Sequence, residues 1–144
     1  HFEESVFELV AAGYTPVITH PERLTWIEDH HEVFPRLVRQ GAWLQVTAGA
    51  LTGLFGKRAK YWGERLLGEG QVHLLASDAH SSGRRAPGLS QARAVAEHLL
   101  GADEARRLVL DRPQAILDDL APSQVPALPE AAPPKGWLQR LLRR

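Results

Sequence analysis

Cysteine and methionine are both absent from this sequence of 144 residues. Without cysteine the protein has no disulfides, no thiolate zinc ligands and no cysteine nucleophile. Any metal chemistry must therefore use histidine, aspartate or glutamate side chains. The sequence holds seven histidines and 17 acidic residues, so ligands of these types are available.

The sequence also lacks a net charge and a long apolar run. Its 17 basic residues balance its 17 acidic ones, so no overall basic field attracts nucleic acid and we expect no nucleic-acid partner. No apolar run approaches the roughly 20 residues that cross a bilayer. No signal peptide is visible, and the first residue is His1 rather than methionine. We therefore expect a cytoplasmic protein and interpret His1 as an internal point of a longer chain.

Three short apolar runs alternate with amphipathic stretches. The runs are nearly continuous, as in parallel strands covered on both faces, and occupy residues 15–20, 43–47 and 72–78. Apolar residues at helical spacing predict helices over 2–10, 33–38, 55–66 and 89–99, then two closing helices over 105–109 and 116–120. This alternation predicts an α/β fold with a parallel sheet. The length falls short of the roughly 250 residues of a complete α/β barrel.

The composition changes after residue 120, which we expect to end the folded domain, 1–120. Five prolines between residues 122 and 134 predict a linker over 121–135. Residues 136–144 form a basic tail whose tryptophan and leucines can share one apolar face. Such a tail suits peripheral contact with an anionic membrane surface or an acidic partner helix, and a frayed terminus is the alternative.

Side chains that bind metals stand at the ends of two predicted strands. His20 follows the first strand, where Pro21 prevents the strand from continuing. Asp78 and His80 end the third strand, and residues two apart on an extended segment point to the same side. Parallel strands end at one sheet edge, where α/β proteins place their sites. The three side chains are therefore candidate metal ligands, with hydrogen bonding or turn capping as the structural alternative for each.

Arginines accompany both strand ends. Arg23 lies three residues after His20, and Arg84 and Arg85 follow His80. Guanidinium groups bind phosphate oxygens through paired hydrogen bonds, so Arg23 and Arg85 are candidate phosphate-binding residues. Taken singly, Arg84 and Arg85 are better explained as solvated loop charges. Their combination with the metal candidates favours a phosphoester substrate.

Three segments give the sequence a family resemblance. They are GYTPVITHPER at 13–23, GAWLQVTAGALTGLFG at 41–56 and HLLASDAH at 73–80, the last followed by Arg84 and Arg85. Together they resemble the bacterial metal-dependent tyrosine phosphatases of capsule and exopolysaccharide synthesis, a branch of the PHP (polymerase and histidinol phosphatase) superfamily. The resemblance extends over about residues 1–120.

This resemblance implies a distorted (β/α) barrel, of which the chain is the C-terminal part, with two or three divalent cations, usually manganese. It implies that His20, Asp78 and His80 bind the metal and that Arg23 and Arg85 bind phosphate and act in catalysis. His80 is also a candidate acid for the phenolate leaving group. The implied reaction is hydrolysis of phosphotyrosine on a partner bacterial tyrosine kinase.

The first half of the family pattern is missing. The family opens with an H-x-H strand, and no H-x-H occurs here; Glu3 and Glu4 lie on a predicted helix, so we do not take them as ligands. Gln45, Thr47 and Gly49 match a loop near the family site, although the family often has asparagine where Thr47 stands. We therefore expect the 144 residues alone to be inactive and an exposed sheet edge to favour oligomers. A small phosphate ester as substrate, and a non-catalytic binding module, are the alternative functions.

Overall fold

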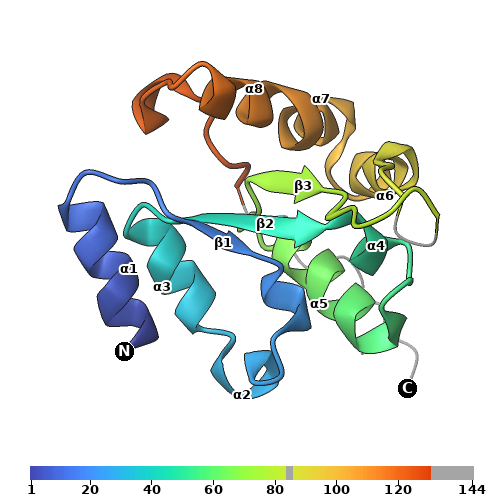
Figure 1. Ribbon diagram of the computed structural model, residues 1–144, viewed down its shortest axis with the longest axis horizontal. Helices are drawn as coiled ribbons and strands as arrows, with labels where there is room; N and C mark the ends of the chain where they lie inside the picture. Colours follow the sequence, from blue (N-terminus) through green and yellow to red (C-terminus); the bar gives the residue numbers. More distant parts are fainter. Residues whose placement is uncertain (84–85, 131–144) are drawn as a thin grey trace, which may run out of the picture.

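The computed structural model describes residues 1–83 and 86–130. Its sheet has three parallel strands in the order β1-β2-β3: β1 (Val17–Thr19), β2 (Trp43–Thr47) and β3 (Leu74–Ala76). Because the strands run the same way, their carboxyl ends lie at one edge of the sheet (Figure 1). The predicted α/β fold with a parallel sheet is therefore confirmed, whereas the three strands alone do not form a barrel.

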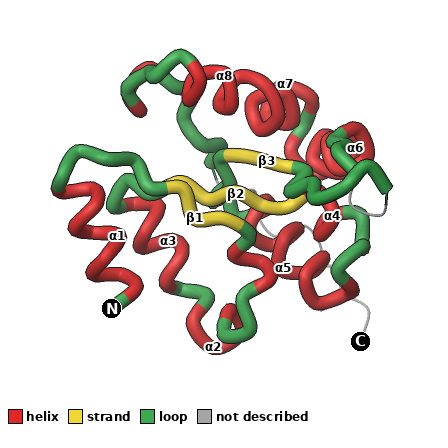
Figure 2. Tube along the Cα trace, viewed as in Figure 1, coloured by secondary structure: helices red, strands yellow, loops and turns green. Residues whose placement is uncertain are grey.

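Helices connect the strands, as the colouring by secondary structure shows (Figure 2). The connections up to β3 are made by α1 (Phe2–Ala11), α2 (Ile27–His30), α3 (Val33–Arg39), α4 (Ala48–Leu51) and α5 (Gly56–Gly68). After β3 come α6 (Ser90–Leu100), α7 (Ala102–Arg106) and α8 (Arg112–Leu117). In Figure 1, α1, α3 and α5 lie on one side of the strands, and α7 and α8 lie on the side of β3.

The apolar residues of these elements form one main core. Every residue of β2 is buried, and Leu44 and Val46 have no exposed surface. Phe34, Leu66 and Leu108 come from three different helical segments and pack in the same cluster. Burying a side chain of this size contributes about 1.5–3 kcal/mol. The core therefore holds the strand ends rigidly, which is what a site at the sheet edge requires.

The outer strands differ from the prediction in length and burial. β1 and β3 are each three residues long, because the backbone turns into the left-handed region at His20 (φ 42°) and Asp78 (φ 50°), just beyond them. The prediction that β1 is covered on both faces is wrong, since Val17 and Thr19 are exposed. Position at the edge of the sheet does not account for this by itself, because β3 is also an outer strand and its first two residues are buried.

The predicted pair of closing helices is also wrong, because the chain forms one continuous helical segment. α7 leads through a π turn (Arg107–Asp111) directly into α8. Pro113 has no N–H to donate to the carbonyl of Val109, four residues earlier, and Val109 lies in the π turn. A break in apolar spacing thus reflects a widened helical turn rather than a loop.

The first part of the proline-rich segment packs against the domain. After a short 3-10 turn (Pro122–Gln124), the carbonyls of Pro126 and Ala127 accept hydrogen bonds from the buried Arg112 at 3.1 and 2.9 Å. Residues 131–144, which include the rest of the predicted linker and the basic tail, lie outside the described residues. None of the helices in the described ranges has the length and apolarity of a membrane span.

Candidate active site

The first candidate segment turns sharply where β1 ends. His20 has φ 42° and ψ 51° and precedes the 3-10 turn Pro21–Arg23. Its backbone N–H donates a hydrogen bond to the carbonyl of Gln45 on β2 at 2.8 Å. For a residue with a side chain, the left-handed conformation is unfavourable by roughly 1–2 kcal/mol. The hydrogen bond to β2 helps to offset this unfavourable energy at His20. This turn carries His20 and Arg23 past the edge of the sheet.

The second candidate segment, which follows β3, also leaves the sheet through a left-handed residue, and it contacts the first segment. Asp78, also left-handed, lies two residues after β3. Its Oδ2 accepts a hydrogen bond from Nη1 of Arg23 at 3.2 Å, across 55 residues of sequence. The structure therefore brings together a carboxylate predicted as a metal ligand and a guanidinium predicted to bind phosphate.

His80 lies beside Asp78 and is exposed. Its Nδ1 is 2.7 Å from the carbonyl oxygen of Asp78 and 3.8 Å from Oδ1 of the same residue. A carbonyl oxygen only accepts hydrogen bonds, so Nδ1 is the donor in this contact. The neutral ring then keeps a lone pair on Nε2, which is the form in which imidazole binds metals.

The three predicted ligands do not make a complete metal site by themselves. Within residues 1–83 and 86–130, no three or more His, Asp or Glu side chains are grouped closely enough to hold a metal ion. His20 shares the sheet edge with Asp78 and His80 but does not form such a group with them. A carboxylate beside an imidazole suits a divalent metal chemically, yet each cation takes about four to six ligands. The described residues therefore fit part of a metal centre.

Of the two candidate phosphate-binding residues, Arg23 is described and Arg85 is not. The Arg23 guanidinium lies over the ring of Phe55, 4.5 Å from its centroid. Its side chain is 34% exposed, so it is accessible from solvent while its plane is held by the ring. Arg84 and Arg85 lie outside the described residues, and their predicted role remains a prediction.

Sequence reasoning missed Glu22, the acidic residue of the HPER motif. Its carboxyl is fully buried, and Oε1 accepts the backbone N–H of Thr47, at the end of β2, at 3.0 Å. Its Oε2 is buried with no hydrogen-bond partner among the described residues. Burial raises the pKa of Glu22 to about 7, and the hydrogen bond from the Thr47 backbone opposes that rise. The sequence signal that could have revealed Glu22 is a carboxylate between Pro21 and Arg23, just after a predicted strand.

The loop expected at Gln45, Thr47 and Gly49 is wrong, because Gln45 and Thr47 belong to β2 and Gly49 belongs to α4. Gln45 and Thr47 are buried, and the backbone N–H of Thr47, the last residue of β2, donates to Glu22. A Cβ built on Gly49 would stand 2.8 Å from Cε2 of Phe55, the residue beneath Arg23. The absence of a side chain at Gly49 therefore leaves room for the Phe55 ring that contacts Arg23.

Comparison with known proteins decides the family. Residues 1–118 match the family model described as "Capsular polysaccharide synthesis, CpsB/CapC". The chain belongs to the CpsB/CapC family. The family resemblance drawn from the three motifs is therefore confirmed.

Named relatives of this CpsB/CapC chain are tyrosine-protein phosphatases. YwqE of Bacillus subtilis is 42% identical over 79 residues, which cover 55% of this chain and 31% of YwqE. CpsB of Streptococcus pneumoniae is 32% identical over 120 residues, which cover 77% of this chain and 48% of CpsB. These matches span less than half the length of either relative.

A solved structure supports the same family assignment. It comes from a crystallographic study of YwqE from Bacillus subtilis and CpsB from Streptococcus pneumoniae, described as unique metal-dependent tyrosine phosphatases. The match has a TM-score of 0.79 at 31% identity and covers 92% of this chain and 52% of that one. The fold of the described residues is therefore that of about half of the relative.

Proposed function

We propose that this CpsB/CapC chain forms the part of a metal-dependent protein-tyrosine phosphatase that carries phosphate-binding arginines and several metal ligands. The observation that supports the proposal is the 3.2 Å hydrogen bond between Arg23 and Asp78. This bond joins a guanidinium, which is a phosphate-binding group, to a carboxylate, which is a metal-binding group. The two groups meet at the edge of the sheet where the parallel strands end. The names of the relatives agree with this chemistry.

Asp78, His80 and His20 are the proposed ligands of a divalent cation, which we take to be manganese, with two or three ions in the complete centre. When bound, such ions lower the pKa of a water molecule toward neutrality and neutralise charge on the phosphoryl group. Asp78 offers carboxylate oxygens, and His80 offers Nε2 because its Nδ1 is directed at the Asp78 carbonyl. Further ligands have to come from groups other than these three.

Arg23 and Arg85 are the proposed phosphate-binding pair. The ring of Phe55 beneath the Arg23 guanidinium limits its orientations, so less entropy is lost when phosphate oxygens bind. A guanidinium held in place also stabilises charge that grows on those oxygens in the transition state. The alternative role of the exposed His80 is that of an acid: when it does not bind the metal, it can give a proton to the leaving phenolate, although a phenolate leaves well without one.

The proposed substrate is phosphotyrosine on a partner tyrosine kinase of polysaccharide synthesis. Relatives named for capsule synthesis and tyrosine dephosphorylation support it. We place the reaction in the cytoplasm and propose that residues 136–144 help the protein to dock on the membrane surface or the kinase. Co-sedimentation with anionic vesicles and kinase pull-down, with and without these residues, test that docking.

The function is tested on the complete protein that its gene encodes, with manganese present. Phosphate release should be faster from a phosphotyrosine peptide than from a phosphoserine peptide or a sugar phosphate, and a chelator should abolish it. Arg23→Ala should lower kcat/KM by about a hundredfold or more. Arg93→Ala, at an exposed arginine of α6, is the matched control and should change little.

Two results would overturn the proposal. Equal or faster hydrolysis of the sugar phosphate would favour the small phosphate ester as substrate. No hydrolysis of any ester with manganese, together with unchanged partner binding in Arg23→Ala, would favour a non-catalytic binding module.

A further inference from the structure

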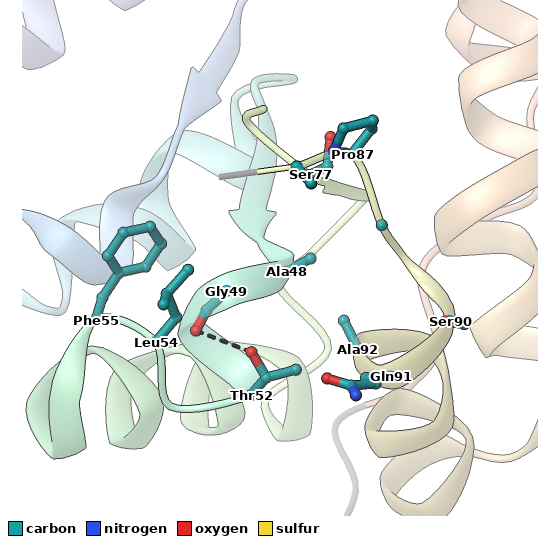
Figure 3. A pocket seen from close by; sticks show the side chains of 12 residues that line it. Ala48, Gly49, Thr52, Leu54, Phe55, Ser77, Pro87, Ser90, Gln91 and Ala92 are labelled. Atoms are coloured by element: carbon teal, nitrogen blue, oxygen red, sulfur yellow. Dashed lines mark hydrogen bonds between the residues drawn. The ribbon is translucent and has the colours of Figure 1, made fainter. Parts of the chain in front are cut away.

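A pocket of about 310 Å³ opens beside the candidate active site. Its walls come from residues 48–55 after β2, from Ser77 after β3, and from residues 86–92 at the start of α6. Figure 3 shows Phe55 and Leu54 on one side of it, Ser77 and Pro87 on another, and Gln91 with Ala92 opposite Leu54. Its size is at the lower end of the roughly 300–1,000 Å³ of small-molecule sites.

Two lining residues of the pocket adjoin the pair formed by Arg23 and Asp78. Phe55 both lines the pocket and lies under the Arg23 guanidinium, 4.5 Å from it. Ser77 lines the pocket and directly precedes Asp78. The pocket therefore adjoins the Arg23 guanidinium through Phe55 and the Asp78 carboxylate through Ser77.

The described part of the lining is uncharged but mixed in polarity. The twelve described residues include no Asp, Glu, Lys, Arg or His, and four of them carry polar side chains, Thr52, Ser77, Ser90 and Gln91. Leu54, Phe55 and Pro87 contribute apolar side chains to the pocket wall. Leu54 is 53% exposed, so a ligand in the pocket would cover apolar surface that now faces water. These apolar side chains gain from covering an aromatic ring, whereas a second phosphate or a carboxylate would lose its hydration and find no cationic partner among the described lining residues.

Gly49 keeps one wall of the pocket open. A Cβ at this position would lie 2.8 Å from Cε2 of Phe55 and 3.1 Å from Cδ2 of Leu54, both too close. Gly49 is in the short helix α4 and its backbone is one that alanine also adopts. An alanine here would therefore act by displacing the two side chains, above all the Phe55 ring.

We propose that this pocket binds the aromatic ring of an aryl phosphate ester whose phosphate is held at Arg23, with Phe55 and Gly49 determining the specificity. The inference rests on the proposed function and deepens it, because it says why an aryl ester is preferred to an alkyl or sugar ester. Phe55 then has two contacts, one with the guanidinium that binds phosphate and one with the ring that the phosphate carries.

Two phosphonates that cannot be hydrolysed test this pocket by binding alone. The dissociation constants of phenylphosphonate and methylphosphonate are measured by calorimetry on the complete protein with manganese. Phenylphosphonate should bind about tenfold more tightly, as expected for burying a ring. Gly49→Ala and Phe55→Leu should reduce that ratio to about threefold or less.

Matched control variants separate an effect on the pocket from a general loss of stability. Gly68→Ala makes the same substitution in α5 where a Cβ meets no atom within 4 Å, and Phe7→Leu changes a ring that is 60% exposed on α1. Both should keep the tenfold ratio. Because the readout is a ratio, a loss of phosphate affinity through Arg23 raises both dissociation constants and leaves their ratio unchanged.

The outcomes are distinguishable. If neither phosphonate nor inorganic phosphate binds, the proposed function fails and the pocket proposal falls with it. If both phosphonates bind equally, or if Gly49→Ala and Phe55→Leu keep the ratio, only the pocket proposal is overturned. If both variants fail to fold, nuclear Overhauser effects between the phenyl protons and the Leu54 methyls, recorded with magnesium, decide it: their presence supports the pocket and their absence overturns it.

Discussion

Glu22 illustrates how a single residue holds the candidate site in place. Its carboxyl lies in the turn that carries His20 and Arg23, and it accepts the backbone N–H of Thr47 on the neighbouring strand. The group is fully buried, so water cannot replace this acceptor. The turn is thus tied to β2 by a side chain whose removal would leave an N–H unpaired.

Replacing Glu22 should show this through stability. Glu22→Ala should lower the free energy of unfolding by about 1–3 kcal/mol, because the Thr47 N–H loses its acceptor. Glu22→Gln keeps an oxygen at the same place and should cost less. Urea unfolding followed by circular dichroism measures both variants. Equal losses in the two would contradict a role for the hydrogen bond.

His73 gives stability a dependence on pH. Its ring stacks on Trp43, with centroids 4.9 Å apart, and its Nδ1 accepts the N–H of Leu44 at 3.2 Å. Burial lowers the pKa of His73 to about 3, and the charge of Arg112 lowers it further. The unfolded chain binds the proton near pH 6.5, whereas the folded protein does not. The contribution of His73 is therefore complete above pH 6.5 and is lost as the pH falls toward 3.

A variant without the His73 imidazole isolates this effect. Between pH 6.5 and 4 the folded protein should lose up to about 3 kcal/mol of unfolding free energy through His73. His73→Gln should have a shallower slope over this range, even if it is less stable at pH 7. His98→Gln, at an exposed position of α6, should keep the slope of the unchanged protein. Parallel slopes in all three proteins would show that His73 does not titrate in this way.

At the scale of elements, prediction succeeds where burial is complete and fails where geometry departs from the ideal. β2 occupies the predicted residues 43–47 because all five are buried. The ends of β1 and β3 were overestimated, since apolar composition does not reveal the left-handed turns at His20 and Asp78. The π turn before Pro113 is likewise invisible to apolar spacing, which finds only a gap.

Arg112 connects several elements and has no exposed surface. It pairs with Glu104 of α7 at 2.6 Å and also bonds the carbonyls of His73, Pro126 and Ala127. The pair therefore fixes the helical segment to β3 and to the chain that follows it. Among the described residues, Glu104 has one other cationic partner, Arg107, at 3.4 Å.

Breaking this connection should be costly. Arg112→Leu should lower the free energy of unfolding by roughly 3 kcal/mol, because Glu104 stays buried with only the longer contact to Arg107. The double variant Glu104→Leu with Arg112→Leu should recover part of that loss. Arg106→Leu, at a mostly exposed arginine of the same segment, is the control and should cost well under about 1 kcal/mol. Urea unfolding measures all three, and an Arg112→Leu variant as stable as the control would contradict the argument.

For the whole molecule, the position of the candidate site is predictable and its completeness is not. Strand polarity alone places the residues after β1 and β3 at one edge, which is why Arg23 and Asp78 could be linked before their contact was known. The contributions of Glu22 and Phe55 depend on which neighbours they meet across the sheet edge, and no local pattern encodes that. Arg85 and the basic tail remain predictions, because they lie outside the described residues.

The same reasoning predicts what residues 1–144 do when isolated. Of the three candidate ligands His20, Asp78 and His80, only Asp78 and His80 contact each other, and the described residues form no metal-binding group of three or more. A centre of two or three cations, each with about four to six ligands, cannot be held by so few side chains. We therefore expect residues 1–144 with manganese to hydrolyse an aryl phosphate no faster than their His20→Ala and Asp78→Ala variants. Robust turnover that both substitutions abolish would contradict this, and would mean that copies of the chain associate to complete the site.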